Sequence, residues 1–252
     1  MDDPVQTYNF IKDVIDVKQK NIVGLAISKG DRLTLAKGRS KIAYIFSLLL
    51  IMGSRHFFKN SCTTLFFKLK KWLSKIGVTK NPSIATYAEN LAIPTKTVIS
   101  PNQKEFVEYL KTLELDIIIN QSQSILKKEL LSIPKIGVLN RHNSLLPKNR
   151  GRLTPFWVLY KQEKETGVSI HFVEEGLDSG DIIVQKKYLV TAKDDFNTLV
   201  KKNYEIAPKA MIEAIDLLEN GFNKFTPNDN ALATYNSTPT LKEAIGFRKL
   251  KN

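Results

Sequence analysis

The 252-residue chain is predicted to be an α/β protein with a doubly wound, mainly parallel sheet. Short runs rich in β-branched residues alternate with longer segments of helical periodicity, which is typical of strands joined by crossover helices. Hydrophobic residues make up 42% of the sequence and charged residues 25%, which is enough for one substantial core but not for two large domains. We therefore expect one main domain with an appendage.

The expected elements follow one another along the chain. The candidate strands cover residues 22–27, 95–99, 116–120, 137–142, 167–173 and 181–189. The candidate helices cover residues 5–17, 83–91, 103–113 and 194–219. The last helix is expected to break near Pro208, because a proline ring removes a backbone hydrogen bond and clashes with the preceding turn.

The first strand of such a sheet should precede the first helix, yet a helix follows almost directly on the opening MDDP. Either the true start lies upstream of Met1, or the sheet lacks a strand that is usually central. The second alternative would cost the core a buried element.

Residues 37–77 depart from the alternation and are expected to form a helical insertion. The apolar residues on one helical face are Leu65, Leu69, Trp72, Leu73 and Ile76, and the lysines on another are Lys68, Lys71 and Lys75. Such a basic amphipathic helix fits two situations, a surface helix packed on its own protein and a helix lying on an anionic membrane surface. The longest apolar stretch, residues 42–53, is far shorter than the roughly 20 residues of a membrane-spanning helix.

Composition limits the compartment and the partners. The single cysteine, Cys62, excludes an intrachain disulfide framework, and no signal peptide is visible, so we expect a cytoplasmic location. The net charge of +13 will attract phosphates, nucleic acids or an anionic membrane surface without selecting among them. After Gly221 the sequence becomes polar and rich in Asn, Thr and Pro, which predicts a mostly irregular tail over residues 223–252.

The stretch GVLNRHNSLLPKNRG, residues 137–151, carries the first chemical motif. An apolar strand leads into Asn140 and His142, and the catalytic groups of α/β sheets gather outside the carboxyl ends of strands. Because strand side chains alternate between the two faces, these two residues point to the same side and can converge on one substrate atom.

The second motif is ETGVSIHFVEEGLDSGDIIVQ, residues 165–185, in which a strand leads into an acidic turn and then a further strand. Gly176 and Gly180 allow the backbone to bend tightly and to approach a ligand closely. They bring Asp178 to a loop tip, where an acid is either simply solvated or catalytic.

The two motifs, in this order and spacing, resemble the formyltransferases that use N10-formyltetrahydrofolate. That family includes glycinamide ribonucleotide, methionyl-tRNA and nucleotide-sugar formyltransferases and the related formyltetrahydrofolate deformylases. The resemblance runs from about Asp116 to Leu189, and more loosely over residues 22–27 and the last helix. It implies a formyltransferase-like variant of the Rossmann fold, with residues 1–222 as the catalytic domain.

The resemblance also implies a catalytic trio of Asn140, His142 and Asp178, with N10-formyltetrahydrofolate as co-substrate and no metal. When an amine attacks the formyl carbon, an oxyanion forms, and donors placed around it lower the barrier by about 3 kcal/mol or more. The Asn140 amide and a protonated His142 can supply these donors. Asp178 is suited to favour the charged form of His142 and to take a proton from the attacking ammonium group.

Further site residues follow from the same resemblance. Those expected around the pterin ring are Ser122, Gln123, Ile125, Leu126, Glu175, Gly176 and Leu177. Residues expected to bind the acceptor from their own chemistry, in part through its phosphates, are Ser144, Lys148, Arg150, Arg152 and His171. His171 is alternatively expected to support the residues of the site without touching the acceptor. Each also has an ordinary interpretation as a core residue or a solvated surface charge.

The expected acceptor is the amine of an amino sugar attached to a nucleotide or a lipid. About seventy residues follow Asp181, too few for the C-terminal barrel of the tRNA-modifying relatives, and Asn143 stands where the glycinamide ribonucleotide enzymes have proline. The motif followed by Phe156 and Trp157 resembles the amino-sugar enzymes more.

Other interpretations stay open at this point. The alternatives are a methionyl-tRNA or glycinamide ribonucleotide formyltransferase, a formyltetrahydrofolate hydrolase, and a basic polyanion- or membrane-binding protein on a decayed scaffold. Peripheral membrane contact and a homodimer are also left open, whereas nucleic acid is not expected as a partner.

Overall fold

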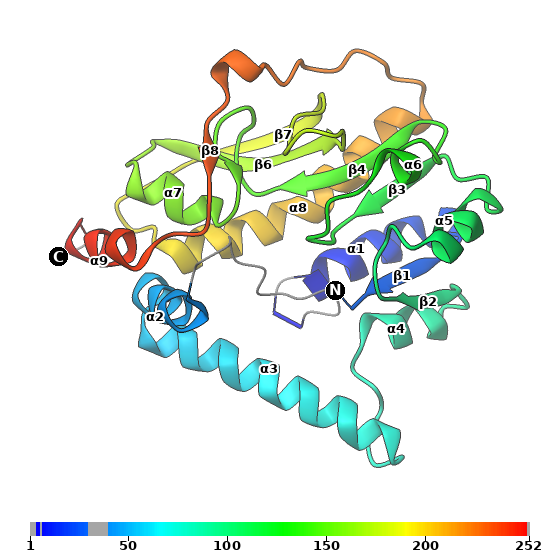
Figure 1. The fold of residues 1–252 in the computed structure, drawn as a ribbon, viewed down its shortest axis with the longest axis horizontal. Coiled ribbons are helices and arrows are strands. Elements are labelled where there is room, and N and C mark those ends of the chain that lie inside the picture. Colours follow the sequence, from blue (N-terminus) through cyan, green and yellow to red (C-terminus); the bar gives the residue numbers. More distant parts are fainter. Residues whose placement is uncertain (1–3, 6, 30–39, 251–252) are drawn as a thin grey trace. The chain divides into compact units, whose positions relative to one another are not determined.

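The structure is a computed structural model, which describes residues 4–5, 7–29 and 40–250. Helices and strands alternate through most of the chain (Figure 1), which confirms the predicted α/β class. The chain divides into two compact units. Unit 1 comprises Met1–Gly30 and Lys59–Leu139, and unit 2 comprises Asp31–Phe58 and Asn140–Asn252.

Unit 1 contains a small parallel sheet with its own core. Its elements are α1 (Thr7–Lys18), the short 3-10 helix η1 (Gln19–Asn21), β1 (Leu25–Ser28), α4 (Ile84–Asn90), β2 (Thr95–Val98), α5 (Lys104–Lys111), β3 (Ile117–Asn120) and α6 (Lys128–Leu131). Strands β1 and β2 pair in parallel, with Leu25 opposite Thr95. The core beside them consists of Ile15, Ile27, Ile84, Ala88 and Ile93.

Unit 2 carries most of the remaining elements. These are α2 (Lys41–Met52), β5 (Arg150–Gly151), α7 (Thr154–Tyr160), β6 (Glu165–Phe172), β7 (Ile182–Leu189), α8 (Phe196–Glu219), the 3-10 helix η2 (Asn230–Leu232), β8 (Tyr235–Asn236) and α9 (Leu241–Leu250). Two elements, α3 (Ser54–Lys75) and β4 (Gly137–His142), each contain a point where the chain passes from one unit to the other.

The larger sheet has the strand order β3-β4-β6-β7. Its last pair is antiparallel, with Glu165 opposite Leu189 and an irregularity at Ile170 and His171. The short strands β5 and β8 pair in parallel. Parallel pairing is therefore confirmed for two strand pairs, and β6–β7 adds an antiparallel edge.

Helix α8 is continuous, so the expected break near Pro208 is wrong. The helix packs against β6 and β7 and buries apolar residues on both sides of the proline, such as Leu199 and Met211. The Asp195 side chain caps its first turn by accepting from Thr198 N. Burial of a face this long outweighs the roughly 3 kcal/mol that an internal proline costs a helix.

The expectation of a mostly irregular tail over residues 223–252 is also wrong for much of its described part. Thr226 forms a bridge with Ile182, β8 pairs with β5, and the chain ends in α9. Helix α9 places Ala244 and Phe247 in a core cluster of unit 2, together with Ile51, Phe156, Trp157 and Phe196. A few well-placed apolar residues anchor this segment, although its overall composition is polar.

The segment expected to be a helical insertion holds α2 and α3, while residues 37–39 lie outside the described residues. Helix α2 packs against α8 and α9 within unit 2. Among the described residues, no single helix is long and apolar enough to cross a membrane, and α2 and α3 pass that test only together, as a bent pair.

Candidate active site

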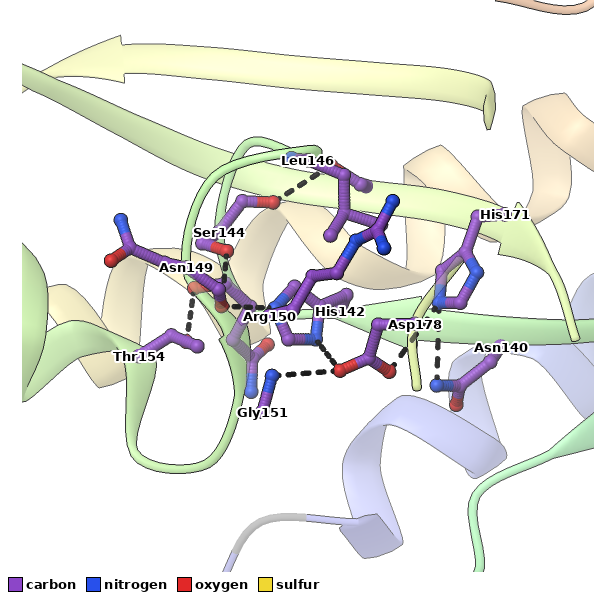
Figure 2. A network of polar contacts seen from close by, with 12 residues as sticks. Asn140, His142, Ser144, Leu146, Asn149, Arg150, Gly151, Thr154, His171 and Asp178 are labelled. Atoms are coloured by element: carbon purple, nitrogen blue, oxygen red, sulfur yellow. Dashed lines mark hydrogen bonds and ion pairs between the residues drawn. The ribbon is translucent and has the colours of Figure 1, made fainter. Parts of the chain in front are cut away.

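Strand β4 and the acidic turn after β6 bring the three expected catalytic residues into one polar cluster of unit 2 (Figure 2). His142 Nδ1 lies 3.5 Å from Asp178 Oδ2. His171 lies between Asn140 and the carboxylate. Its Nε2 is 3.5 Å from Asn140 Nδ2 and 3.9 Å from Asp178 Oδ1. Asn140 and His142 therefore face the same side, as the alternation of the strand predicts.

The His142 ring is buried between two acceptors. Its Nε2 lies 2.8 Å from the Asn149 carbonyl oxygen, which can only accept a hydrogen bond, so this nitrogen carries a proton. Its Nδ1 faces the Asp178 carboxylate. The Nε2–H of His142 is therefore used by the backbone, and Nδ1, beside the carboxylate, is the ring nitrogen left to face a reacting group.

Asp178 is held by the backbone around it. Its φ of 48° lies in the left-handed region, which aspartate tolerates better than most residues. Asp178 Oδ2 accepts from Gly151 N at 2.8 Å, and its carbonyl oxygen accepts from Asn228 Nδ2 at 2.7 Å. A Cβ on Gly180 would lie 2.3 Å from the Phe172 carbonyl oxygen, so this position needs glycine because the turn approaches the end of β6 closely.

His171 is a member of the cluster and is 1% exposed. Its Nδ1 is 2.7 Å from its neighbour's carbonyl oxygen and must donate to it, which leaves Nε2 to accept from Asn140. Burial, assisted by the charge of His142 and opposed by Asp178, lowers the pKa of His171 to about 4. A neutral His171 therefore fixes which end of the Asn140 amide is the donor. This buried position agrees with the supporting alternative for His171 and not with contact to an acceptor.

Two other residues expected to bind the acceptor are buried and form hydrogen bonds within the protein. Arg150 is 1% exposed and donates to the Asn228 carbonyl and side-chain oxygens, to Asn230 Oδ1 and to Tyr235 Oη, at 2.7 to 2.9 Å. Ser144 is also buried, and its hydroxyl donates to backbone carbonyls of its own turn. In this structure Arg150 therefore binds its own protein, and its contact with an acceptor phosphate stays a prediction.

Lys148 and Arg152 remain accessible. Lys148 is exposed and Arg152 is half-buried. Lys148 also lines a pocket of about 720 Å³ together with Leu145, Pro147 and Gln185, but none of the catalytic trio lines this pocket. Of the three cationic side chains expected at an acceptor phosphate, Lys148 is thus the exposed one and Arg152 is half-buried.

The residues expected at the pterin divide between the two units. In unit 2, Glu175, Gly176 and Leu177 form an exposed turn. In unit 1, Ser122 donates to Asn120 Oδ1, Gln123 is exposed, Ile125 is 84% exposed and Leu126 is 6% exposed. Asn102 holds this loop, since its side chain donates to Ile125 O and accepts from Lys127 N, both at 2.8 Å. Ile125 and Leu177 thus present apolar surface, whereas Leu126 is a core residue.

Sequence reasoning missed a group of buried asparagines that supports the cluster. Asn149, whose carbonyl meets His142, donates to both oxygens of Glu163 at 2.9 and 3.0 Å. Its own Oδ1 accepts from Asn236 Nδ2 at 2.7 Å, and its N–H donates to Thr234 Oγ1 at 2.8 Å. The only signal in the sequence was the abundance of asparagine after Gly221, which is equally typical of loops.

The chain matches the Formyl transferase family over residues 68–215, a segment that contains β4 and the acidic turn. It is 38% identical over 159 residues to a methionyl-tRNA formyltransferase of Kosmotoga olearia, covering 63% of this chain and 51% of that protein. It is 32% identical over 193 residues to the methionyl-tRNA formyltransferase of Thermotoga neapolitana, covering 71% and 61%. The chain therefore spans about half to three fifths of the length of these relatives.

A solved phosphoribosylglycinamide formyltransferase from Anaplasma phagocytophilum has a similar fold, with a TM-score of 0.52 and 20% sequence identity over 61% of this chain and 78% of that one. The sequence match covers the elements that carry Asn140, His142 and Asp178. This chain belongs to the formyl transferase family.

Proposed function

We propose that the chain transfers a formyl group from N10-formyltetrahydrofolate to a primary amine. The observation that carries this proposal is the cluster of Asn140, His142 and Asp178 within the segment matched to the family. The cluster joins two hydrogen-bond donors to one carboxylate, which is what acyl transfer between nitrogens requires.

In the proposed reaction, the amine nitrogen attacks the formyl carbon, and the carbonyl oxygen becomes an oxyanion. The Asn140 amide and the His142 imidazolium donate to this oxygen, and Asp178 takes the proton that the attacking nitrogen loses. The bond from carbon to the folate nitrogen then breaks, and the proton held by Asp178 passes to that nitrogen as tetrahydrofolate leaves. Removing one oxyanion donor typically slows such reactions by about 10²- to 10³-fold.

The proposed acceptor is the amine of an amino sugar carried on a nucleotide or a lipid. The likeness of the HNSLLPKNRG motif to the amino-sugar enzymes supports it, and exposed Lys148 and half-buried Arg152 offer cations for its phosphates. Phe156 and Trp157 are buried in the core of unit 2, so they would act through the fold and not by touching the sugar.

Methionyl-tRNA is the second candidate acceptor. The curated relatives at 38% and 32% identity are methionyl-tRNA formyltransferases, and the net charge of +13 would also suit a polyanion. The cytoplasmic location and the homodimer remain predictions under either acceptor.

The test is to incubate the chain with N10-formyltetrahydrofolate and a panel of acceptors, and to follow tetrahydrofolate and formylated product by mass spectrometry. The panel comprises several nucleotide-linked amino sugars, methionyl-tRNA and glycinamide ribonucleotide. We expect product with one acceptor, and a loss of at least roughly 10²-fold in His142→Ala and Asp178→Asn. His56→Ala is the matched control, because His56 is an exposed histidine on α3 and should leave the rate unchanged.

Other outcomes would redirect or reject the proposal. Release of formate without a formylated amine would make the chain a formyltetrahydrofolate hydrolase. Product with methionyl-tRNA alone would replace the amino sugar as acceptor. Turnover that survives in both His142→Ala and Asp178→Asn would reject the role of the trio.

A further inference from the structure

Helix α3 carries an apolar stripe that its own protein leaves exposed. Its exposed large apolar side chains have exposed fractions between 49% and 69% and are Phe58, Leu65, Phe66, Leu69 and Trp72; Ile76, directly after the helix, is 60% exposed. At about 100° per residue on an ideal helix, these positions occupy one arc of about 120°. None of the described residues of α3 is buried.

The opposite side of α3 is the more protected one. Phe57, Thr64 and Phe67 are half-buried, and helical geometry places them away from the stripe. The helix therefore turns its less apolar side inward and its most apolar side to the solvent. A surface helix that packs on its own protein has the reverse arrangement, so the pattern calls for an external partner.

The charges on α3 identify that partner by sign. Residues 54–75 contain six cationic side chains and no aspartate or glutamate, the cations being Arg55, Lys59, Lys68, Lys70, Lys71 and Lys75. On the helical wheel, Lys68 and Lys75 lie along one edge of the stripe, and Lys59 and Lys70 along the other. Lysines in such flanking positions can lay their stems along apolar surface while their ammonium groups reach anions.

We propose that α3 lies in the interface of an anionic lipid bilayer, with its apolar stripe toward the acyl chains and its flanking lysines among the lipid phosphates. The combination of an aromatic and aliphatic face with basic edges is the pattern of interfacial helices. This proposal is independent of the acceptor and of the formyl transfer reaction.

Two other partners fit the stripe less well. A second copy of α3 would place six cations against six cations without one acid to compensate them. A nucleic acid would pair with the lysines but would leave the aliphatic side chains of Leu65, Leu69 and Ile76 in water, because nucleic-acid surfaces are recognised through phosphates and stacked bases.

The two tryptophans allow a direct test. Trp72 is 57% exposed on the stripe, whereas Trp157 is 8% exposed and donates through Nε1 to Ser237 O. The chain is mixed with vesicles of phosphatidylcholine containing 30% phosphatidylglycerol, or of phosphatidylcholine alone, on the order of the anionic content of cell membranes. We expect cosedimentation and a blue shift of tryptophan emission with the anionic vesicles only. Trp72→Phe should keep the binding and lose the shift.

A matched pair of variants tests the orientation of the helix. The double variant Leu65→Glu with Leu69→Glu should weaken vesicle binding at least roughly tenfold, because it puts two carboxylates on the membrane face. Leu189→Glu should bind like the unchanged chain, since Leu189 is a 71% exposed leucine at the end of β7. All three leucines are exposed, so thermal unfolding should stay the same.

Several results would overturn the proposal. Equal binding to both kinds of vesicle, or a double variant that binds like Leu189→Glu, would remove the basis for an anionic interface. A dimer that the double variant dissociates, without vesicle binding by the unchanged chain, would assign the stripe to a second copy. Binding of random RNA that the double variant abolishes, again without vesicle binding, would assign it to nucleic acid.

Discussion

His171 shows how one buried side chain links the candidate site to stability. Its pKa of about 4 lies below its ordinary value of 6.5, because burial penalises the charged ring. Between these two values the unfolded chain binds a proton that the folded chain does not. The contribution of this residue to stability is therefore fully present above pH 6.5 and is lost as the pH falls toward 4.

We expect His171→Gln to flatten this pH dependence. The free energy of unfolding, measured with urea at pH 7 and at pH 5, should fall for the unchanged chain and fall less for the variant, because glutamine does not titrate. His56→Gln is the control, since His56 is exposed on α3, and it should behave like the unchanged chain. Identical pH dependence in all three proteins would show that His171 is not the group that titrates.

The residues at the site also show what a sequence can predict. Asn140 and His142 were predicted to share a side because strand alternation is a local rule. Arg150 was expected at a phosphate, yet its two terminal guanidinium nitrogens donate to Asn228, Asn230 and Tyr235, roughly eighty residues further along the chain. No local sequence pattern indicates partners this far away. The charge of Arg150 could therefore be predicted from the sequence, but its burial could not.

The short strand pair β5–β8 connects the C-terminal segment to the candidate active site. Gly151 in β5 has a φ of +104° and donates its N–H to Asp178 Oδ2. A Cβ added to Gly151 would lie 2.1 Å from the Asn236 carbonyl oxygen in β8. The strand pair therefore tolerates no side chain at this position, and a substitution would disturb the support of Asp178 together with the pairing.

We expect Gly151→Ala to lower the free energy of unfolding by about 2 kcal/mol or more, through the backbone strain and the clash with β8. Gly246→Ala is the matched control, because an added Cβ would make only an ordinary contact, 3.5 Å from Tyr160 Oη. It lies inside α9, so alanine should stabilise by up to about 1 kcal/mol. Urea unfolding of both variants checks the signs, and a shift in the same direction for both would contradict this account.

The observed bounds of helices and strands agree with the predicted ones where the hydrophobic periodicity is strong. They differ where tertiary packing determines the local structure. The candidate strand at residues 137–142 coincides with β4, and the candidate helices at 83–91 and 103–113 each enclose the observed helix. Pro208 and α9 were mispredicted for opposite reasons. In α8, packing against two strands overrides a helix breaker, and in α9, two buried residues are enough to order a polar segment.

At the scale of the whole molecule, the α/β class followed from alternation, but the division into two units did not. Length and composition limit how much apolar surface can be buried, and they led us to expect one main domain with an appendage. The structure gives each unit a buried cluster of its own, one around Ile84 and one around Phe247. Which residues share a core depends on contacts far apart in sequence, so this partition could not be read from local patterns.

Separate clusters predict separate effects of core substitutions. Phe247 is 2% exposed and Ile84 is 1% exposed, so truncating either to alanine should cost about 2–5 kcal/mol. In hydrogen exchange followed by mass spectrometry, we expect Phe247→Ala to reduce protection mainly in peptides of α7 and α8, and Ile84→Ala mainly in peptides of α1 and β1. Because each substitution leaves the other cluster fully packed, an equal loss of protection in both sets of peptides would mean that the chain unfolds as one cooperative body.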